Sequence, residues 1–366
     1  MPGLQLLLFA ATTWLLRIDT AEQGGISAAS MRAVWIPRPG PPEVLEVREG
    51  ADPVAKPDQV LVRVRASGVN FADVSARLGF YPDAPPPPCV VGYEVSGVVE
   101  QVGASVQSIK AGDRILALTR FGGYADAVAI PAEQVFAMPA EMSFEEGAAI
   151  PVNYLTAILM LRRFGNVTEG DRVLVHAAAG GVGMAAIQLC RIAGAEVIGT
   201  ASASKHETLK KMGVAHCIDY RTEDFEEGVK RVTGGRGVDI ALDATGAFRK
   251  SYRCLAPLGR LVCFGLSQAS SGMSPSRFRA LLAVAQLPWF HPIKLMNDNK
   301  AVIGVNLGHL WDHIGMLRRE MIGLLADYGA GRIKPVVGKT FPLVEAAKAH
   351  RFMQERQNVG KVVLTS

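Results

Sequence analysis

The sequence lacks the cysteine pattern of a disulfide-bonded or structural zinc protein. The chain has five cysteines, an odd number, and none of them forms a C-x-x-C pair. They are Cys89, Cys190, Cys217, Cys254 and Cys263. We therefore expect neither a disulfide framework nor a structural zinc. A reducing compartment, the cytoplasm, fits this thiol usage best.

The chain also lacks a strong charge of either sign and a long apolar run. Its 39 Lys and Arg against 34 Asp and Glu leave a net charge of +5, too small and too dispersed to indicate a nucleic-acid partner. Pro, Gly or charged residues interrupt every apolar run before the roughly 18 to 20 residues that a bilayer-spanning helix needs. With 366 residues, 49% of them hydrophobic, the chain is expected to be globular, with two domains.

The amino-terminal stretch is ambiguous. Residues 4–16 read LQLLLFAATTWLL and resemble the apolar part of a signal peptide, but no Lys or Arg precedes them. A strand-like sequence, MRAVWI, begins only at Met31. We treat residues 1–30 as an extension, either disordered or ahead of the true start, with an export signal or a membrane anchor as the alternative.

Two patterns divide the rest of the chain. Residues 31–151 contain short β-rich runs separated by turns, such as QVLVRVRASGV and DRILAL, and the tail at 335–366 contains a similar run, GKVVLT. Residues 152–334 alternate strands with helices, which is typical of a parallel, doubly wound sheet. The sequence thus predicts an α/β protein with one β-rich and one doubly wound domain. Within the latter, the apolar segment 268–311 is expected to pack on the sheet or at a subunit interface, with a lid or lipid-surface helix as the alternative.

A glycine-rich turn carries the first functional signal. The strand Val173–Val175 leads into an A-x-G-x-x-G turn and then an apolar helix, the setting of a dinucleotide-binding turn in which alanine replaces the first glycine. Small residues let the backbone approach a pyrophosphate, and N–H groups at the helix start bind its charge. The predicted pyrophosphate site comprises Ala178, Gly180, Gly181, Val182 and Gly183.

The end of the second strand indicates which dinucleotide binds. NAD-selective sites place Asp or Glu about 20 residues beyond the glycines, but here residues 200–205 read TASASK. Hydroxyl groups and a cation suit a 2′-phosphate, which a carboxylate would repel. NADPH is therefore favoured over NADH, and Tyr220, at the end of the third strand, is a further candidate for the phosphate. The alternative for Lys205 is a solvated lysine at a helix start.

A metal site is not expected from the histidines. His309 and His313 are spaced as in a zinc-binding helix, but Leu310 stands where the H-E-x-x-H motif has its glutamate. No G-x-S-x-G elbow indicates a nucleophile either.

Taken together, these motifs resemble a known superfamily. The stretches GVNFADVSARLGFYP, FGGYADAVAIP and HAAAGGVGMAAIQLCR are similar to medium-chain dehydrogenase/reductases of the zinc-free quinone oxidoreductase (zeta-crystallin) branch. GTASASKHETLKKMGV is most similar to the vesicle amine transport protein subfamily, also called synaptic vesicle membrane protein homologues. The resemblance covers residues 31–366.

The resemblance implies a GroES-like catalytic domain formed by residues 31–151 and 335–366, and a Rossmann domain at 152–334 with NADPH in the cleft between the two. Zinc-dependent relatives have a Cys where this chain has Asn70 and a His where it has Tyr93, so no catalytic zinc is implied. The chemistry then depends on the nicotinamide, which suits reduction of a quinone or an enone.

Roles for individual residues also follow from the resemblance. The catalytic candidates are Asn70, beside the nicotinamide ribose and substrate, Thr156, against the nicotinamide, and Tyr81, which would orient the substrate carbonyl or donate a proton. Without the resemblance, Asn70 is equally well a turn residue and Tyr81 a packing aromatic. The further cofactor contacts are Ser202, Lys205, Tyr220, Gly265, Arg356 and Lys361.

The sequence therefore predicts a zinc-independent, NADPH-dependent oxidoreductase that acts on a quinone or an α,β-unsaturated carbonyl compound. One alternative is an NADPH-binding protein of little activity that acts at a membrane or on a partner through residues 268–311. Another is an enoyl-thioester reductase. The resemblance further implies a homodimer.

Overall fold

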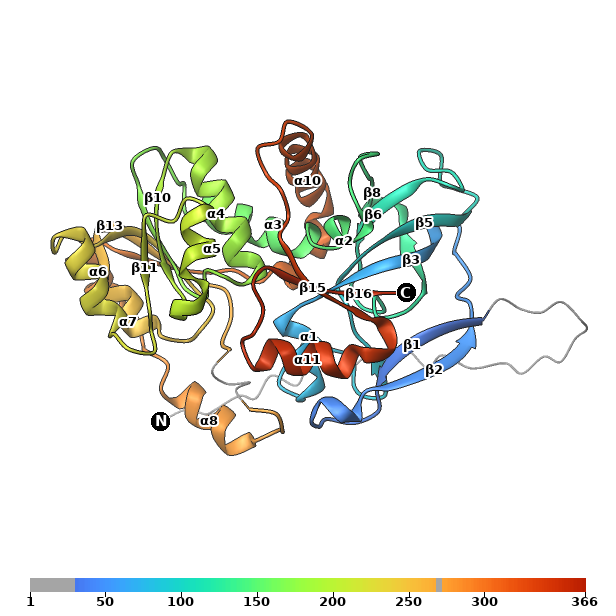
Figure 1. Cartoon of the computed structure of the whole chain (residues 1–366), viewed down its shortest axis with the longest axis horizontal. Coiled ribbons are helices and arrows are strands. Elements are labelled where there is room, and N and C mark those ends of the chain that lie inside the picture. Colours follow the sequence, from blue (N-terminus) through green and yellow to red (C-terminus); the bar gives the residue numbers. More distant parts are fainter. Residues whose placement is uncertain (1–29, 268–271) are drawn as a thin grey trace, which may run out of the picture.

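The protein consists of two lobes that lie side by side, with helix α10 (Ile314–Gly329) above their junction (Figure 1). The structure is a computed structural model and describes residues 30–267 and 272–366. The predicted extension, except for Ser30, and the first residues of the 268–311 segment lie outside the described residues.

One lobe is built on antiparallel β-structure and is completed by the tail of the chain. Its main sheet has seven strands: in order β15 (Val337–Pro342), β16 (Lys361–Thr365), β3 (Gln59–Val69), β5 (Glu94–Val102), β6 (Arg114–Leu118) and β8 (Val135–Ala137), with β7 (Ala127–Pro131) paired to β3. A smaller sheet contains β2 (Glu46–Ala51), β1 (Ser30–Ile36) and β4 (Cys89–Val90). Helices α1 (Phe71–Arg77) and α11 (Ala346–Gln354) pack beside each other below the main sheet (Figure 1).

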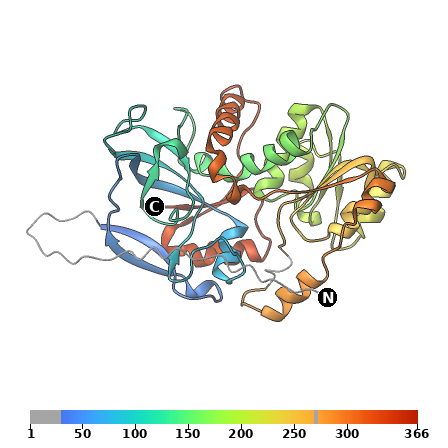
Figure 2. The same cartoon turned by 180° about the vertical axis from the view of Figure 1, so that it is seen from behind.

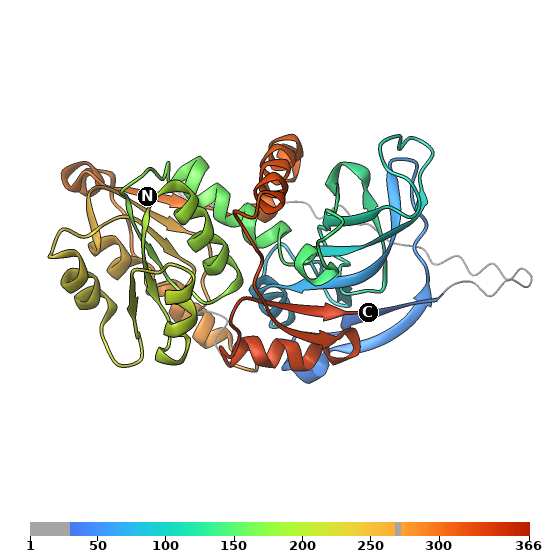
Figure 3. The same cartoon turned by 45° about the horizontal axis from the view of Figure 1, so that its top comes forward.

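The other lobe is a six-stranded parallel sheet with helices on both faces (Figure 3). The strand order is β11 (His216–Ile218), β10 (Glu196–Thr200), β9 (Arg172–Val175), β12 (Val238–Asp243), β13 (Leu255–Cys263) and β14 (Ala301–Gly304). Its helices include α4 (Gly181–Ala193), α5 (His206–Lys211), α6 (Phe225–Thr233) and α7 (Phe248–Arg253). This is the doubly wound order that reverses between β9 and β12, where such sheets bind ligands. The predicted fold class is confirmed.

The two lobes share one hydrophobic core. Helices α2 (Phe144–Gly147) and α3 (Pro151–Ile158) cross between them, and α3 continues as a π-helical turn over Leu159–Phe164. A single cluster of buried side chains includes Leu116 of β6, Leu155 of α3 and Val173 of β9. Burial of apolar surface across the junction therefore holds the lobes together.

The segment at 268–311 differs from what its sequence pattern suggests. It contains two short helices, α8 (Arg277–Ala285) and α9 (Pro292–Asp298), and strand β14, which the sequence pattern did not reveal. Helix α8 projects below the junction of the lobes in both views (Figures 1 and 2), and Phe278 is 75% exposed. Packing of α8 on the sheet is thus a wrong prediction, because Phe278, Leu281 and Leu282 are exposed; the subunit interface stays a prediction. None of the described helices is long and apolar enough to cross a bilayer.

Candidate functional site

Two adjoining cavities lie in the cleft between the lobes. The first has a volume of about 500 Å³ and runs along the carboxyl ends of β9 and β10; the second, of about 910 Å³, lies toward β14. Both are lined by Asn70, Phe71, Val182, Ala244, Phe264 and Ser267. Because these walls are shared, a molecule in the first cavity can meet one in the second.

The glycine-rich turn borders the first cavity at the start of α4. Gly180 is the N-cap of α4 and provides no side chain to cap it, so the first N–H groups of the helix have no partner within it. A Cβ atom on Gly181 would lie 2.4 Å from the Asn153 side chain, and one on Gly183 would lie 2.5 Å from the carbonyl oxygen of Ala178. The turn therefore fits the approach of a pyrophosphate to bare backbone, as the motif predicts.

Ala178 lies beneath this turn rather than on the cavity wall. It is fully buried, and a Cβ on Gly199 of β10 would lie 3.0 Å from the Ala178 Cβ atom. The preceding residue, Ala177, turns the chain with a φ of 49°, in the left-handed region, and does line the cavity. A small residue at 178 thus allows close packing of turn and strand.

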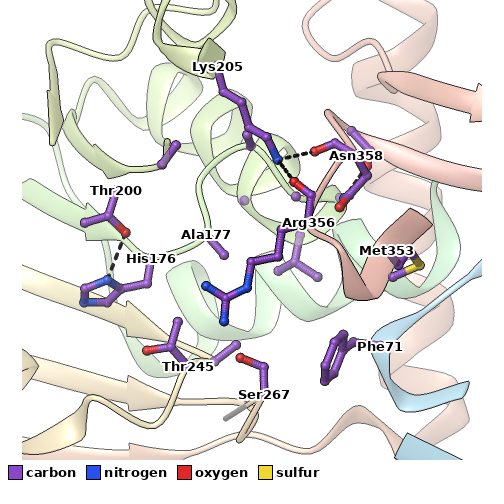
Figure 4. A pocket seen from close by; sticks show the side chains of 18 of the residues that line it. Phe71, His176, Ala177, Thr200, Lys205, Thr245, Ser267, Met353, Arg356 and Asn358 are labelled. Atoms are coloured by element: carbon purple, nitrogen blue, oxygen red, sulfur yellow. Dashed lines mark hydrogen bonds between the residues drawn. The ribbon is translucent and has the colours of Figure 1, made fainter. Parts of the chain in front are cut away.

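The opposite end of the first cavity is cationic. The Lys205 ammonium group donates hydrogen bonds of 2.7 Å to the backbone carbonyls of Arg356 and Asn358, so this lysine is not merely solvated. Figure 4 shows the Arg356 side chain reaching into the cavity, and its guanidinium group donates to the Tyr220 hydroxyl at 3.4 Å. Ser202 also lines this end. Residues of both lobes therefore meet here.

The electrostatics of this end suit a phosphate. No described residue that lines the first cavity is Asp or Glu. Burial lowers the pKa of Lys205; Tyr220 opposes this, and the repulsion of Arg221 and Arg356 adds to it. Burial raises the pKa of Tyr220, but the nearby Arg356 and Arg221 together hold it below its usual value. A dianionic group would relieve this repulsion.

Lys361 and Asn70 meet at the floor of the cleft. The Lys361 ammonium group is buried and donates to the carboxylate of Glu94 and, at 2.6 Å, to Oδ1 of Asn70. The Asn70 amide donates in turn to Glu94 Oε1 at 3.0 Å. The other carboxylate oxygen of Glu94 accepts from the backbone N–H of Val152 at 2.7 Å. This network fixes the orientation of the Asn70 amide at the point where the two cavities join.

Several residues that sequence reasoning missed also line the first cavity. His176 follows β9, and its ring makes hydrogen bonds of 3.0 Å to Thr200 Oγ1 and 3.1 Å to Ser251 Oγ (Figure 4). Burial lowers the pKa of His176, so the ring is neutral at pH 7. A polar residue directly after a central parallel strand was the available signal. For Asn153 and Asn358 the sequence offered no such signal, because only the fold brings them to the cavity.

The second cavity contains the remaining candidates, Thr156, Tyr81 and Gly265. Its described lining has no Asp, Glu, Lys or Arg and is rich in aromatic and aliphatic side chains, such as Phe80, Trp311 and Leu317. Burial, and after it the charge of Asp83, raises the pKa of Tyr81 to about 12, so the phenol remains protonated. Such a cavity fits an uncharged, apolar molecule that presents a hydrogen-bond acceptor.

The mouth of the second cavity is bridged by polar contacts between the lobes. Asp83 accepts a hydrogen bond of 2.8 Å from His309 Nε2 and one of 3.3 Å from the Asn306 amide. His309 therefore faces a single carboxylate. Among the described residues, no group of three or more His, Cys, Asp or Glu side chains is placed to hold a metal ion.

Two family models match the chain. The model described as alcohol dehydrogenase GroES-like domain matches residues 56–140, and the model described as zinc-binding dehydrogenase matches residues 181–324. The first match falls in the antiparallel lobe and the second in the doubly wound lobe.

Individual proteins are similar over most of the chain. A synaptic vesicle membrane protein VAT-1 homolog of Rattus norvegicus is 44% identical over 327 residues, which cover 87% of this chain and 80% of the relative. The crystal structure of human synaptic vesicle membrane protein VAT-1 homolog-like protein has a TM-score of 0.81 at 35% identity and covers 92% of this chain and 98% of its own. The crystal structure of Escherichia coli quinone oxidoreductase complexed with NADPH has a TM-score of 0.82 at 30% identity. The match covers 92% of this chain and 100% of that chain.

Proposed function

This chain belongs to the VAT-1 homologues of the medium-chain dehydrogenase/reductase superfamily, and on that premise we propose that it is a zinc-independent, NADPH-dependent reductase of quinones or α,β-unsaturated carbonyl compounds. The observation that carries the proposal is the pair of joined cavities. One has a glycine turn and a carboxylate-free cationic end, and the other is uncharged and apolar. The neighbour of known structure with NADPH bound supports the choice of cofactor.

The residues of the first cavity would hold the dinucleotide. The backbone from Gly180 to Gly183 would receive the pyrophosphate, and Lys205 with Arg356 would receive the 2′-phosphate. When bound, the nicotinamide supplies a hydride. Asn70 and Thr156 would place its ring against the second cavity, which both residues line.

The residues of the second cavity would prepare the acceptor. Negative charge develops on the substrate oxygen during reduction, and a protonated phenol such as Tyr81 stabilises it by donating a hydrogen bond. The apolar walls exclude water, which strengthens that interaction. A proton from solvent would complete the reduction.

The direct test is NADPH oxidation by the purified protein in the presence of a panel of quinones and enones. We expect turnover with several apolar acceptors, and a loss of kcat of about 100-fold in Asn70→Ala, a change typical of removing a preorganised polar group. Measured binding of NADPH without turnover of any acceptor would overturn the enzymatic proposal.

A second candidate function is suggested by exposed apolar side chains. Helices α8 and α9 and the link between them expose large apolar side chains: Phe278, Leu281, Leu282, Val284, Trp289, Ile293 and Met296. Trp289 is 97% exposed. Exposed apolar side chains of this kind suit a lipid surface or a protein partner, and the relatives carry the name of a vesicle membrane protein.

Vesicle sedimentation tests this second candidate. A protein in which Phe278, Leu281 and Trp289 are replaced by Ser should lose binding to vesicles of phosphatidylcholine and phosphatidylserine. Val54 and Val344, which are exposed elsewhere, are the matched control when replaced by Ser. If the native protein does not sediment with the vesicles, with or without NADPH, the membrane function is excluded.

A further inference from the structure

One hydroxyl group in the second cavity has no partner. Tyr93 lies between the glycine turn at Gly92 and the start of β5, and it lines the cavity although the residue is only 8% exposed. Its hydroxyl is buried, and no described residue gives it a hydrogen bond of normal length; the Tyr81 phenol is the nearby hydroxyl that influences its pKa. A buried hydroxyl without a partner costs about 1–3 kcal/mol. A hydroxyl that borders a cavity of about 910 Å³ can recover this cost from a ligand.

The surrounding backbone holds Tyr93 in place. Gly92 has a φ of 105°, and a Cβ atom there would lie 2.7 Å from the backbone nitrogen of Tyr124, so only glycine fits. The Gly92 N–H donates to Asp73 Oδ1 at 3.1 Å, and the Tyr93 carbonyl accepts from the Thr119 N–H at 2.8 Å. The direction in which Tyr93 leaves the backbone is therefore fixed before any ligand binds.

The ring of Tyr93 is held as firmly as its backbone. It stands edge-on to the Tyr81 ring, with centroids 6.0 Å apart, and it packs against Phe121 at 5.3 Å. Burial, and after it the charge of Asp73 and the neighbouring Tyr81 and Asp83, raises the pKa of Tyr93 far above its usual value. The hydroxyl is thus a permanent donor, and Tyr93 and Tyr81 are two phenols in the lining of a cavity that has no Asp, Glu, Lys or Arg among its described residues.

We propose that the Tyr93 hydroxyl binds and orients the carbonyl oxygen of the acceptor, and that Tyr93 and Tyr81 together select substrates with a carbonyl group on an apolar ring system. This inference rests on the proposed function for the class of ligand. It assigns the selection of the substrate's carbonyl group to Tyr93, directly before β5, in addition to Tyr81.

A binding experiment that needs no turnover tests the proposal. Fluorenone and fluorene have the same ring skeleton, and only fluorenone carries a carbonyl group. In the protein loaded with NADP⁺, we expect fluorenone to bind roughly fivefold more tightly than fluorene, the size of one hydrogen bond. In Tyr93→Phe the preference should be clearly reduced, because fluorenone loses the Tyr93 hydrogen bond and keeps that of Tyr81, while fluorene binding stays the same.

Tyr154→Phe is the matched control. Tyr154 is also a buried tyrosine whose hydroxyl lacks a partner, but it lines neither cavity. This variant should keep the preference for fluorenone. Both variants should melt no lower than the native protein, because each removes an unpaired hydroxyl; a clear loss of thermal stability in Tyr93→Phe alone, with the preference intact, would show a structural role and overturn the proposal.

The outcome also separates this proposal from the proposed function. If the native protein reduces quinones or enones but Tyr93→Phe keeps both the fluorenone preference and kcat, the role of Tyr93 is refuted and the reductase stands. If no acceptor is reduced but Tyr93→Phe reduces the preference for fluorenone, the binding role stands and the reductase falls. If both hold, kcat of Tyr93→Phe should fall about tenfold or more at unchanged NADPH affinity.

Discussion

The two ends of the glycine turn are expected to serve different purposes, as the motif itself predicts: Gly180 lets a pyrophosphate approach, and Gly183 allows close packing of helix and strand. A Cβ atom on Gly183 would meet the backbone carbonyls of Ala178 and Ala177 at 2.5 and 2.7 Å, and backbone cannot move aside cheaply. On Gly180 the nearest atom is the Ala177 oxygen at 3.2 Å, and φ is −79°, which alanine readily adopts. We therefore expect Gly183 to matter for folding and Gly180 for cofactor binding.

Alanine substitutions at the two positions should separate these requirements. Gly183→Ala is expected to lower the free energy of unfolding by about 1–3 kcal/mol, the usual range for overpacking. Gly180→Ala should cost less than about 1 kcal/mol, yet weaken NADPH at least tenfold, since its methyl group enters the space next to the pyrophosphate. Urea unfolding and fluorescence titration measure the two effects. Equal destabilisation by both substitutions would contradict the division.

At the scale of elements, the sequence predicts most strands and the glycine-rich turn before α4, but not the long-range contacts. The turn before α4 is recognisable because strand, glycines and helix are contiguous in the chain. The contact of Lys205 with the carbonyls of Arg356 and Asn358 joins residues about 150 positions apart, and no local pattern encodes it. The exposure of apolar side chains on α8 could not be predicted either, because periodicity identifies an apolar face but not what covers it.

Helix α11 carries a buried histidine that makes stability depend on pH. His350 is fully buried, shares a 3.2 Å hydrogen bond with the Tyr124 hydroxyl, and has no partner at Nδ1 among the described residues. Burial, and after it the charge of Arg77, holds the pKa of His350 well below its usual value. The unfolded chain therefore binds a proton near pH 6.5 that the folded protein excludes, and stability contributed by His350 is lost as pH falls below about 6.5.

His350→Gln isolates this contribution. The difference in free energy of unfolding between the native protein and the variant should shrink as pH falls from 6.5 to 5, approaching about 1.4 kcal/mol per pH unit. Asp73, whose pKa burial raises to about 7, acts in the opposite direction; it is present in both proteins, so the difference removes its contribution except for its coupling to His350 through the Tyr124 hydroxyl, which both side chains contact. Parallel stability curves would show that His350 titrates normally.

At the scale of the whole molecule, the candidate cofactor cavity is a joint product of both lobes. Lys205 and Tyr220 come from the doubly wound lobe, whereas Arg356 and Lys361 come from the tail that completes the antiparallel lobe. The absence of Asp and Glu after β10 could be seen in the sequence, but that Arg356 shares this end could not be derived from any local spacing. A dinucleotide that touches both lobes should therefore stabilise the molecule as one unit.

Thermal unfolding with the two dinucleotides tests this joint site. NADPH at 100 times its Kd is expected to stabilise the protein by about 2.7 kcal/mol, in a single transition, because ligand bridges the lobes. NADH at the same concentration should give a smaller shift, since it lacks the phosphate that Lys205 and Arg356 would bind. Arg356→Ala should bring the two shifts close together by removing one of the two cations.

Arg351→Ala provides the control for this experiment. Arg351 lies on α11, close in sequence to Arg356, but it pairs with Glu43 at the surface and does not line the first cavity. Loss of an exposed ion pair costs about 0–1 kcal/mol and should leave the difference between NADPH and NADH unchanged. If NADH stabilises the native protein as strongly as NADPH, the cationic end does not select a phosphate. If instead Arg356→Ala keeps the full preference for NADPH, selection belongs to Lys205 and its own lobe, and the tail serves only to close the sheet.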